Sequence, residues 1–291
     1  MTNALQTIRI GQWTIAGFVE SEFALDGGSM FGVIPRMMWQ KLIPPDAENR
    51  VAMVANVFVV DTGDRRIVLD TGLGDSLSEF DRKVYAPKGP SRMDAALHAN
   101  GTPPDSITDV ILTHLHTDHS NGAFVGDPDA PGLRFPNATH HVQKQEWEDA
   151  MTPNERTDAV YIRHRLQRIA DSGNLRLFDG EAVITPGVSV QRTGGHTRGH
   201  QTVEVRAGDE RFVYFADLVP TRFHLKGPWV AAVDLFPLDT MKAKRALLAD
   251  CCDTKTIIGF DHDAGVIFGR LVQKQKWMDV VPVDVATKPI P

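Results

Sequence analysis

One short run in the middle of the chain constrains its fold more than any other part of the sequence. Residues 113–119 read Thr-His-Leu-His-Thr-Asp-His and directly follow the apolar run Val110-Ile111-Leu112. Three imidazoles and a carboxylate are costly to bury behind an apolar strand unless they bind something. Both groups are good ligands for zinc and similar divalent ions. The run therefore predicts a metal site on a loop where a strand ends.

Three ligand-type residues occur later in the same setting. His196 follows Gly194-Gly195, and such glycines let a backbone turn sharply near a site. Asp217 and His262 each follow a short strand-like run. We expect these residues to join the central run in one metal site made of His114, His116, Asp118, His119, His196, Asp217 and His262. The other histidines considered are interpreted as solvated or hydrogen-bonded residues: His98, His140, His141, His164 and His200.

The order of predicted elements favours two packed sheets with helices outside them. β-Branched and aromatic runs predict strands, and amphipathic runs with stop signals predict helices. The chain of 291 residues suits one large domain or two small ones. The predicted strands are 7–10, 13–19, 51–60, 66–69, 107–113, 188–192, 202–206, 211–215 and 256–259, and the predicted helices are 92–99, 143–151, 158–170 and 240–249.

Composition narrows the possible partners and compartments. The formal net charge of −6 disfavours nucleic acid, because an acidic surface repels phosphate backbones. No stretch approaches the ~18 apolar residues of a membrane span, and Met1 to Ile10 does not resemble a secretory signal. The two cysteines, Cys251 and Cys252, are neighbours that rarely bridge to each other. We therefore expect a cytoplasmic protein without disulfides or a membrane partner.

The ligand pattern resembles a known family. His-X-His-X-Asp-His, then His, Asp and His in that order, is similar to the metallo-β-lactamase fold hydrolases, and the resemblance runs from about Asn56 to His262. Residues 68–72, Val-Leu-Asp-Thr-Gly, resemble the family's early strand motif, in which an aspartate, here Asp70, holds a ligand histidine. The resemblance implies one α/β (α+β) domain over 1–291, folded as a four-layer αβ/βα sandwich.

The resemblance also implies how the ligands divide between two ions. His114, His116 and His196 would bind the first, Asp118, His119 and His262 would bind the second, and Asp217 would bridge both. Two ions ~3.5–4 Å apart share a hydroxide that attacks the substrate. Asp118 and Asp217 are the expected catalytic residues, with Asp118 steering the hydroxide or moving its proton. Zinc is the expected metal, and Mn²⁺, Co²⁺ and Fe²⁺ fit similar donors.

Within the family, the chain most resembles the quorum-quenching N-acyl homoserine lactonases. The resemblance lies in residues 25–35, 193–201 and 216–221. It implies a hydrolase that opens lactone rings, with residues 25–45 as an amino-terminal loop that covers the substrate or a second subunit of a homodimer. Some lactonases have a tyrosine that contacts the lactone carbonyl where this chain has Pro220. The candidate substrate residues are Met30, Phe31 and His224.

Two other functions stay open at this point. Organophosphate triesterases of this fold share the same seven ligands, so an aryl phosphotriester is an alternative substrate. A non-catalytic metal-binding module ranks last, because binding modules derived from this fold usually lose ligands. Metal analysis and a substrate panel would distinguish these possibilities.

Overall fold

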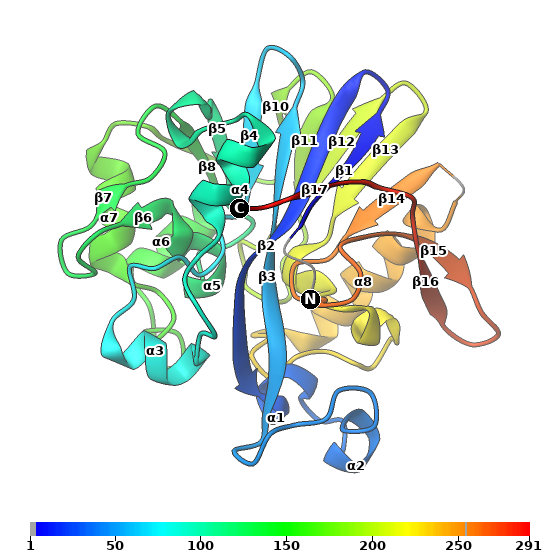
Figure 1. Ribbon diagram of the computed structural model, residues 1–291. Helices are drawn as coiled ribbons and strands as arrows, with labels where there is room; N and C mark the ends of the chain where they lie inside the picture. Colours follow the sequence, from blue (N-terminus) through cyan, green and yellow to red (C-terminus); the bar gives the residue numbers. More distant parts are fainter. Residues whose placement is uncertain (1–3, 254) are drawn as a thin grey trace.

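Two large sheets form the centre of the molecule in the computed structural model, which describes residues 4–253 and 255–291 (Figure 1). The first sheet has the order β17 (Ala286–Pro289), β1 (Ala4–Ile10), β2 (Trp13–Asp26), β3 (Arg50–Asp61), β4 (Arg66–Leu69), β5 (Asp109–Ile111), β8 (Thr139–Gln143) and β9 (Leu175–Phe178). The second has the order β10 (Glu181–Thr185), β11 (Val188–Arg192), β12 (Gln201–Ala207), β13 (Glu210–Tyr214), β14 (Thr256–Gly259), β15 (Phe268–Gln273) and β16 (Met278–Pro282). A small pair, β6 (Phe124–Val125) and β7 (Gly132–Leu133), lies apart from both.

Helices cover the outer face of each sheet. One apolar cluster joins β2 and β3 to α4 (Met93–Asn100), α6 (Lys144–Met151) and α7 (Arg163–Asp171). A second cluster fills the space between the sheets, where Phe58 packs on Phe212 and Phe268. A third packs α8 (Pro237–Cys251) on the far face of the second sheet through Leu248. These layers confirm the expected four-layer sandwich.

Parallel strand pairs determine where the chain's polar loops gather. β4, β5 and β8 are mutually parallel neighbours, and β13 is parallel to β14. The carboxyl ends of parallel neighbours meet at one edge of a sheet, which is where open sheets collect ligands. Asp70, residues 112–119, Asp217 and His262 all follow such ends.

The strand predicted over 13–19 is longer than expected. β2 continues to Asp26 and pairs with β3 along its length, with a register shift between Val19 and Ser21. The strand thus continues through the polar run Glu-Ser-Glu at residues 20–22. Glu20 is nevertheless fully buried, because its carboxylate accepts the N–H groups of Leu73 and Gly74 at 3.0 and 3.2 Å.

Two other segments differ from their predicted form. Residues 25–45 contain two short helices, α1 (Gly27–Phe31) and α2 (Arg36–Trp39), and the Asp26 carboxylate caps α1 through the N–H of Gly28. The helix predicted over 158–170 begins only at Arg163, since hydrogen-bonded turns at Asn154 hold the preceding segment as a loop. The strands predicted over 51–60 and 66–69 form an antiparallel hairpin, in which Asp61 pairs with Arg66.

A fourth apolar cluster, separate from the sandwich layers, packs the 25–45 segment on the ends of β2 and β3. Phe31 stacks on Trp39 at 5.3 Å and meets Trp229 edge-on at 5.8 Å. This segment appears as an appendage at the end of β2 and β3 in Figure 1. Among the described residues, no helix has both the length and the apolar character needed to cross a bilayer.

Candidate metal centre

The seven predicted ligands converge at one edge of the sandwich. Residues 114–119 leave β5 and enter the short helix α5 (Thr117–Ser120). Asp217 lies in a 3₁₀ turn directly after β13, and His262 lies three residues after β14. His196 comes from the loop between β11 and β12, where Gly194 and Gly195 have φ of 63° and 88°. A Cβ on Gly195 would come within 2.7 Å of the Thr240 backbone, so a larger residue would displace this loop.

The first group of donors contains three imidazoles and one carboxylate. One atom each from His114, His116, His196 and Asp217 lies within 4.8 Å of all the others. Oδ2 of Asp217 is 3.0 Å from Nε2 of His196 and 3.6 Å from Nε2 of His114. His116 faces the same point with Nδ1, 3.0 Å from Nε2 of His196.

A second group shares Asp217 with the first. It contains His119, Asp217, Asp261 and His262, again with their donor atoms within 4.8 Å of one another. Nε2 of His262 is 3.3 Å from Oδ1 of Asp217 and 3.6 Å from Oδ2 of Asp118. Asp118 therefore lies beside this group although it is not one of the four, while Asp261 was given no role in the sequence analysis.

Three of the imidazole rings are fixed by their Nδ1 atoms. Nδ1 of His119 donates to Asp70 at 2.9 Å, and Nδ1 of His196 donates to Asp234 at 2.8 Å. Nδ1 of His262 donates to the carbonyl of Val54 at 2.7 Å. Each hydrogen bond leaves Nε2 facing the centre, which is how proteins usually orient metal-bound imidazoles.

Asp70 connects the two sheets at this point. Its carboxylate accepts the N–H and hydroxyl of Thr113, both at 2.7 Å, as well as the Tyr214 hydroxyl at 2.8 Å. Asp70 also has a φ of 51°, an uncommon value for a residue with a side chain. The β4 end that carries Asp70 is thereby tied to His119 and to β13.

Several buried polar atoms in the two groups have no hydrogen-bond partner. They are Nε2 of His114, Nε2 of His119, Oδ1 of Asp217 and Oδ2 of Asp261. Bare buried donors and acceptors are costly in a native protein. Imidazole nitrogens and carboxylate oxygens that face one another satisfy that need by sharing divalent cations, so the residues present fit a metal centre.

The charges of these side chains are strongly coupled. Burial alone would raise the pKa of Asp217, but the imidazoles of His196, His119 and His262 hold it well below its ordinary value. Burial lowers the pKa of His196, yet Asp217 and Asp234 together raise it to about 10. His114 behaves oppositely, because burial and its histidine neighbours lower its pKa. Divalent ions would replace the protons on His196, so metal binding should release protons.

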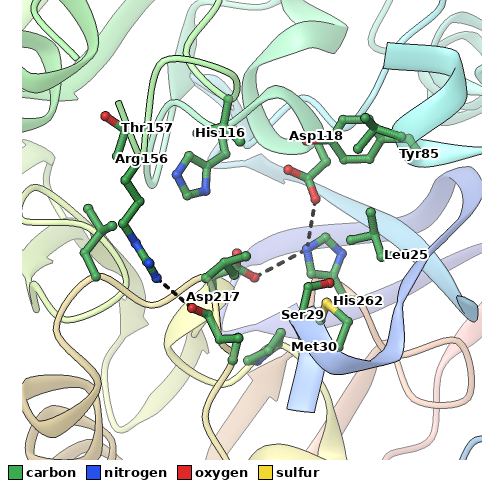
Figure 2. Close-up of a pocket in the computed structure, with 17 residues that line it drawn as sticks. Leu25, Ser29, Met30, Tyr85, His116, Asp118, Arg156, Thr157, Asp217 and His262 are labelled. Atoms are coloured by element: carbon green, nitrogen blue, oxygen red, sulfur yellow. Dashed lines mark hydrogen bonds and ion pairs between the residues drawn. The ribbon is translucent and has the colours of Figure 1, made fainter. Parts of the chain in front are cut away.

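A pocket of about 410 Å³ opens onto this centre (Figure 2). Its inner end, called the metal end below, is formed by His116, Asp118, Asp217 and His262. Figure 2 shows Asp118 and Asp217 on either side of His262. The walls are mostly apolar and come from five separate stretches of the chain, with Leu25, Met30, Val84, Tyr85, Val160, Pro220, Ala231, Val233 and Leu235.

The three candidate substrate residues have different positions. Met30 lines the pocket. Phe31 and His224 lie behind the wall, 2% and 1% exposed, with their rings stacked at 5.2 Å. Nε2 of His224 donates to the carbonyl of Met30 at 2.8 Å, so His224 holds the wall that Met30 forms. Pro220 lines the pocket and makes its wall apolar there.

Backbone contacts join the segments around the outer opening, called the rim below, which comprises Ser29, Met30, Arg156 and Ala232. The N–H of Ala232 donates to the carbonyl of Ser29 at 2.8 Å. Nη2 of Arg156 donates to the carbonyl of Ala232 at 2.8 Å. Three segments far apart in sequence thus meet at one alanine.

Sequence reasoning missed four residues around the centre. Asp234 orients His196, Asp261 faces His119 and His262, and Tyr85 lines the pocket near Asp118. Glu146, fully buried, accepts the Leu115 N–H at 3.0 Å together with the hydroxyls of Tyr161 and Thr197. Asp261 alone had a local signal, since it directly precedes a predicted ligand at a strand end. The others need the fold to bring their loops together.

Comparisons with known proteins agree with this geometry. The sequence model described as the Metallo-beta-lactamase superfamily matches residues 50–250. An N-acyl homoserine lactonase from Bacillus sp is 25% identical over 221 residues, covering 71% of this chain and 80% of that protein.

Two solved structures share the fold over nearly the whole chain. A probable metal-dependent hydrolase from Staphylococcus aureus superposes with a TM-score of 0.87 at 26% identity, covering 95% of this chain and 99% of the other. AidC, a dizinc quorum-quenching lactonase solved with N-hexnoyl-L-homoserine, superposes with a TM-score of 0.78 at 22% identity, covering 96% and 97%.

Proposed function

The chain belongs to the metallo-β-lactamase superfamily, and on that premise we propose that this hydrolase opens the ring of N-acyl homoserine lactone-like substrates. One observation carries the proposal: a single pocket joins a metal end of histidines and aspartates to apolar walls. An ester group fits the first part and an acyl chain fits the second. The named lactonase relatives support the same substrate class.

We propose that all seven predicted residues hold two divalent ions, with Asp217 between them. The bound ions would lower the pKa of water and polarise the ester carbonyl. Zinc is the metal we expect, with Mn²⁺, Co²⁺ and Fe²⁺ as alternatives. The distances from the Asp217 oxygens to Nε2 of His196, His119 and His262, all between 3.0 and 3.6 Å, support a shared position for this carboxylate.

Asp118 is the proposed acceptor of the proton that the attacking water loses. Its side chain is 10% exposed and lines the pocket, whereas most of the other ligand candidates are more deeply buried. A carboxylate in that position would lie between the bound ions and a substrate in the pocket. It can take a proton from water and return it to the leaving oxygen of the opened ring.

Tyr85 is the proposed hydroxyl donor to the lactone in a pocket where Pro220 offers none. Tyr85 ends α3 (Glu79–Tyr85), and its ring packs edge-on against Phe23 at 5.8 Å. Burial and the nearby Asp118 charge raise the pKa of this phenol well above its ordinary value, so it stays protonated at neutral pH. A protonated phenol donates a hydrogen bond to a carbonyl oxygen.

The decisive experiment measures proton release by the zinc-reconstituted protein on a substrate panel. The panel contains short- and long-chain acyl homoserine lactones, a γ-lactone, an aryl phosphotriester and a β-lactam. We expect fast opening of acyl homoserine lactones that a chelator abolishes. Slow lactone opening beside fast phosphotriester cleavage would reject the lactonase assignment in favour of the triesterase.

The triesterase remains the second candidate because of one feature of the wall. Pro220 leaves the pocket apolar where some lactonases have a tyrosine. An uncharged aryl phosphotriester would fit such a wall without losing a hydrogen bond. The same two ions would polarise its phosphoryl oxygen.

The segment 25–45 is proposed to belong to the single domain and to cover the substrate or a second copy of the chain. Leu25, Ser29 and Met30 line the pocket. Beyond them the segment exposes Val33 and Met37, which are 88% and 66% accessible. Analytical ultracentrifugation of the native protein and of Met37→Ser distinguishes the two roles, because a weakened dimer in the variant indicates a subunit contact.

A further inference from the structure

Asp261 is held rigidly beside the second group of donors. It follows β14, and only 2% of it is exposed. Its Oδ1 accepts the N–H of His262 at 3.0 Å, and its carbonyl accepts the N–H of Asn56 at 2.7 Å. Asn56 also donates from Nδ2 to the carbonyls of Phe260 and Asp263. The direction of the Asp261 carboxylate is therefore fixed by the fold.

The other oxygen of this carboxylate has no hydrogen-bond partner. Oδ2 of Asp261 lies 3.5 Å from Nε2 of His262 and 3.8 Å from Nε2 of His119. A carboxylate oxygen of Asp261 also lies within 4.8 Å of a carboxylate oxygen of Asp217. Two buried carboxylates that face each other repel unless a cation or a proton lies between them.

A purely structural role explains only half of this side chain. Capping the His262 N–H uses Oδ1 and leaves Oδ2 bare. Asp263, in the same turn and equally buried, shows what a structural aspartate looks like here. Its Oδ1 accepts from Arg222, Gly265 and Val266, and its Oδ2 accepts from the Arg222 N–H.

We propose that Oδ2 of Asp261 is an additional ligand of the second ion, on the side away from the pocket. The second position would then combine His119 and His262 with the carboxylates of Asp118, Asp217 and Asp261. The first position combines three imidazoles with Asp217 alone. The inference rests on the proposed two-ion centre, but it does not depend on the substrate.

The two positions would therefore prefer different metals. Imidazole-rich sites suit zinc, whereas carboxylate-rich sites suit oxygen-preferring ions such as Mn²⁺. Affinity for zinc exceeds that for Mn²⁺ at most sites, so the expected difference is relative. The first position takes zinc when zinc is limiting, and the second then accepts Mn²⁺.

The test titrates Mn²⁺ into protein that already carries one equivalent of zinc. The electron paramagnetic resonance signal of free Mn²⁺ reports binding without any assay of activity. We expect the native protein to bind one Mn²⁺ per chain and Asp261→Asn to bind it at least tenfold more weakly. Asp263→Asn is the matched control, and we expect its Mn²⁺ affinity to equal that of the native protein.

The remaining outcomes separate this inference from the proposed function. Equal Mn²⁺ affinity in Asp261→Asn and the native protein overturns the inference, and so does an equal loss in both variants. A native protein that binds neither metal overturns the two-ion hydrolase itself. If Asp261→Asn does not fold, a crystal structure of the zinc-loaded native protein decides, because a ligand oxygen lies about 2.0–2.2 Å from the ion. A clearly longer distance to Oδ2 rejects the inference.

Discussion

The metal end and the rim of the same pocket are built in different ways. At the metal end, side chains hold side chains: Asp70 orients His119, and Asp234 orients His196. At the rim, main-chain carbonyls are the acceptors: the Ala232 N–H donates to the Ser29 carbonyl, and Nη2 of Arg156 donates to the Ala232 carbonyl. The metal end depends on residue identity at nearly every position, whereas the rim depends on the path of the backbone.

The two constructions predict different responses to mutation. A change at the metal end should abolish activity and leave the fold intact. A change in the buried hydrogen-bonded groups behind it, called the frame below, should lower the free energy of unfolding. A change at the rim should alter substrate affinity by a small factor. Four experiments test this contrast, from the largest expected effect to the smallest.

Asp217→Asn should have the largest effect, because it removes the one carboxylate common to both donor groups. We expect hydrolysis to fall by about 10³-fold, or ~4 kcal/mol of transition-state stabilisation, with little change in the melting temperature of the metal-free protein. Steady-state kinetics and metal content check this. Asp239→Asn, on the exposed part of α8, serves as the control and should keep full activity.

Glu146→Ala should mainly lower stability, because three buried donors lose their acceptor: the Leu115 N–H and the hydroxyls of Tyr161 and Thr197. We expect a loss of about 3 kcal/mol in the free energy of unfolding. Glu146→Gln keeps an acceptor oxygen and should lose clearly less. Equal stability of both variants and the native protein in denaturant titrations would show that this frame is dispensable.

His224 should make the stability of the pocket wall at Met30 sensitive to acid. Burial, and then the Lys244 charge, lower the pKa of His224 to about 4, from an ordinary value of 6.5. Between these two pH values, the folded state thus binds fewer protons than the unfolded state. The contribution of neutral His224 to the free energy of unfolding is therefore fully present above pH 6.5 and is lost as the pH falls through 4. The expected loss is about 3 kcal/mol.

His224→Gln isolates this effect from the acid sensitivity of the candidate metal ligands. Glutamine can still donate to the Met30 carbonyl but does not titrate. The difference in unfolding free energy between native protein and variant should shrink by about 3 kcal/mol from pH 7 to pH 4. A constant difference across that range would mean that His224 is not the titrating group.

Arg156→Ala should have the smallest effect. Arg156 is exposed, and its described hydrogen bond goes to the Ala232 carbonyl. We expect KM to rise about two- to fivefold, with kcat nearly unchanged, as for the loss of one solvated hydrogen bond. A fall in kcat beyond tenfold would place Arg156 in the chemistry and end the contrast between rim and metal end.

The same contrast explains what the sequence could predict. The candidate ligands from His114 to His262 carry a local signature, so the sequence predicts them without knowledge of the fold, whereas it predicts Asp70 only through the family resemblance. Asp234 lies in a loop 38 residues from the histidine that it orients, and nothing in its neighbourhood signals that contact. Glu20 shows the same limit, because its burial depends on the N–H groups of residues 73 and 74.

Lys244 gives the clearest case of a misleading local pattern. The predicted helix 240–249 has basic residues on one face, yet Lys244 is 1% exposed, and Nζ donates to the carbonyls of His224, Lys226 and Trp229. A charged side chain on an amphipathic helix normally points to solvent. Here the loop after Pro220 wraps around the charge, which no periodicity reveals.

The meeting of three segments at Ala232 bears on how this protein can acquire new substrates. The contacts at Ala232 use its own N–H and carbonyl, so the side chain at position 232 is free to vary while the opening keeps its shape, whereas the Ser29 hydroxyl donates to the Asp26 carbonyl. Mutations there can change which molecules enter the pocket, while the residues of the metal end stay unchanged. Directed evolution of the rim would then change the substrate specificity and keep the activity, whereas substitutions at the metal end would first abolish the activity.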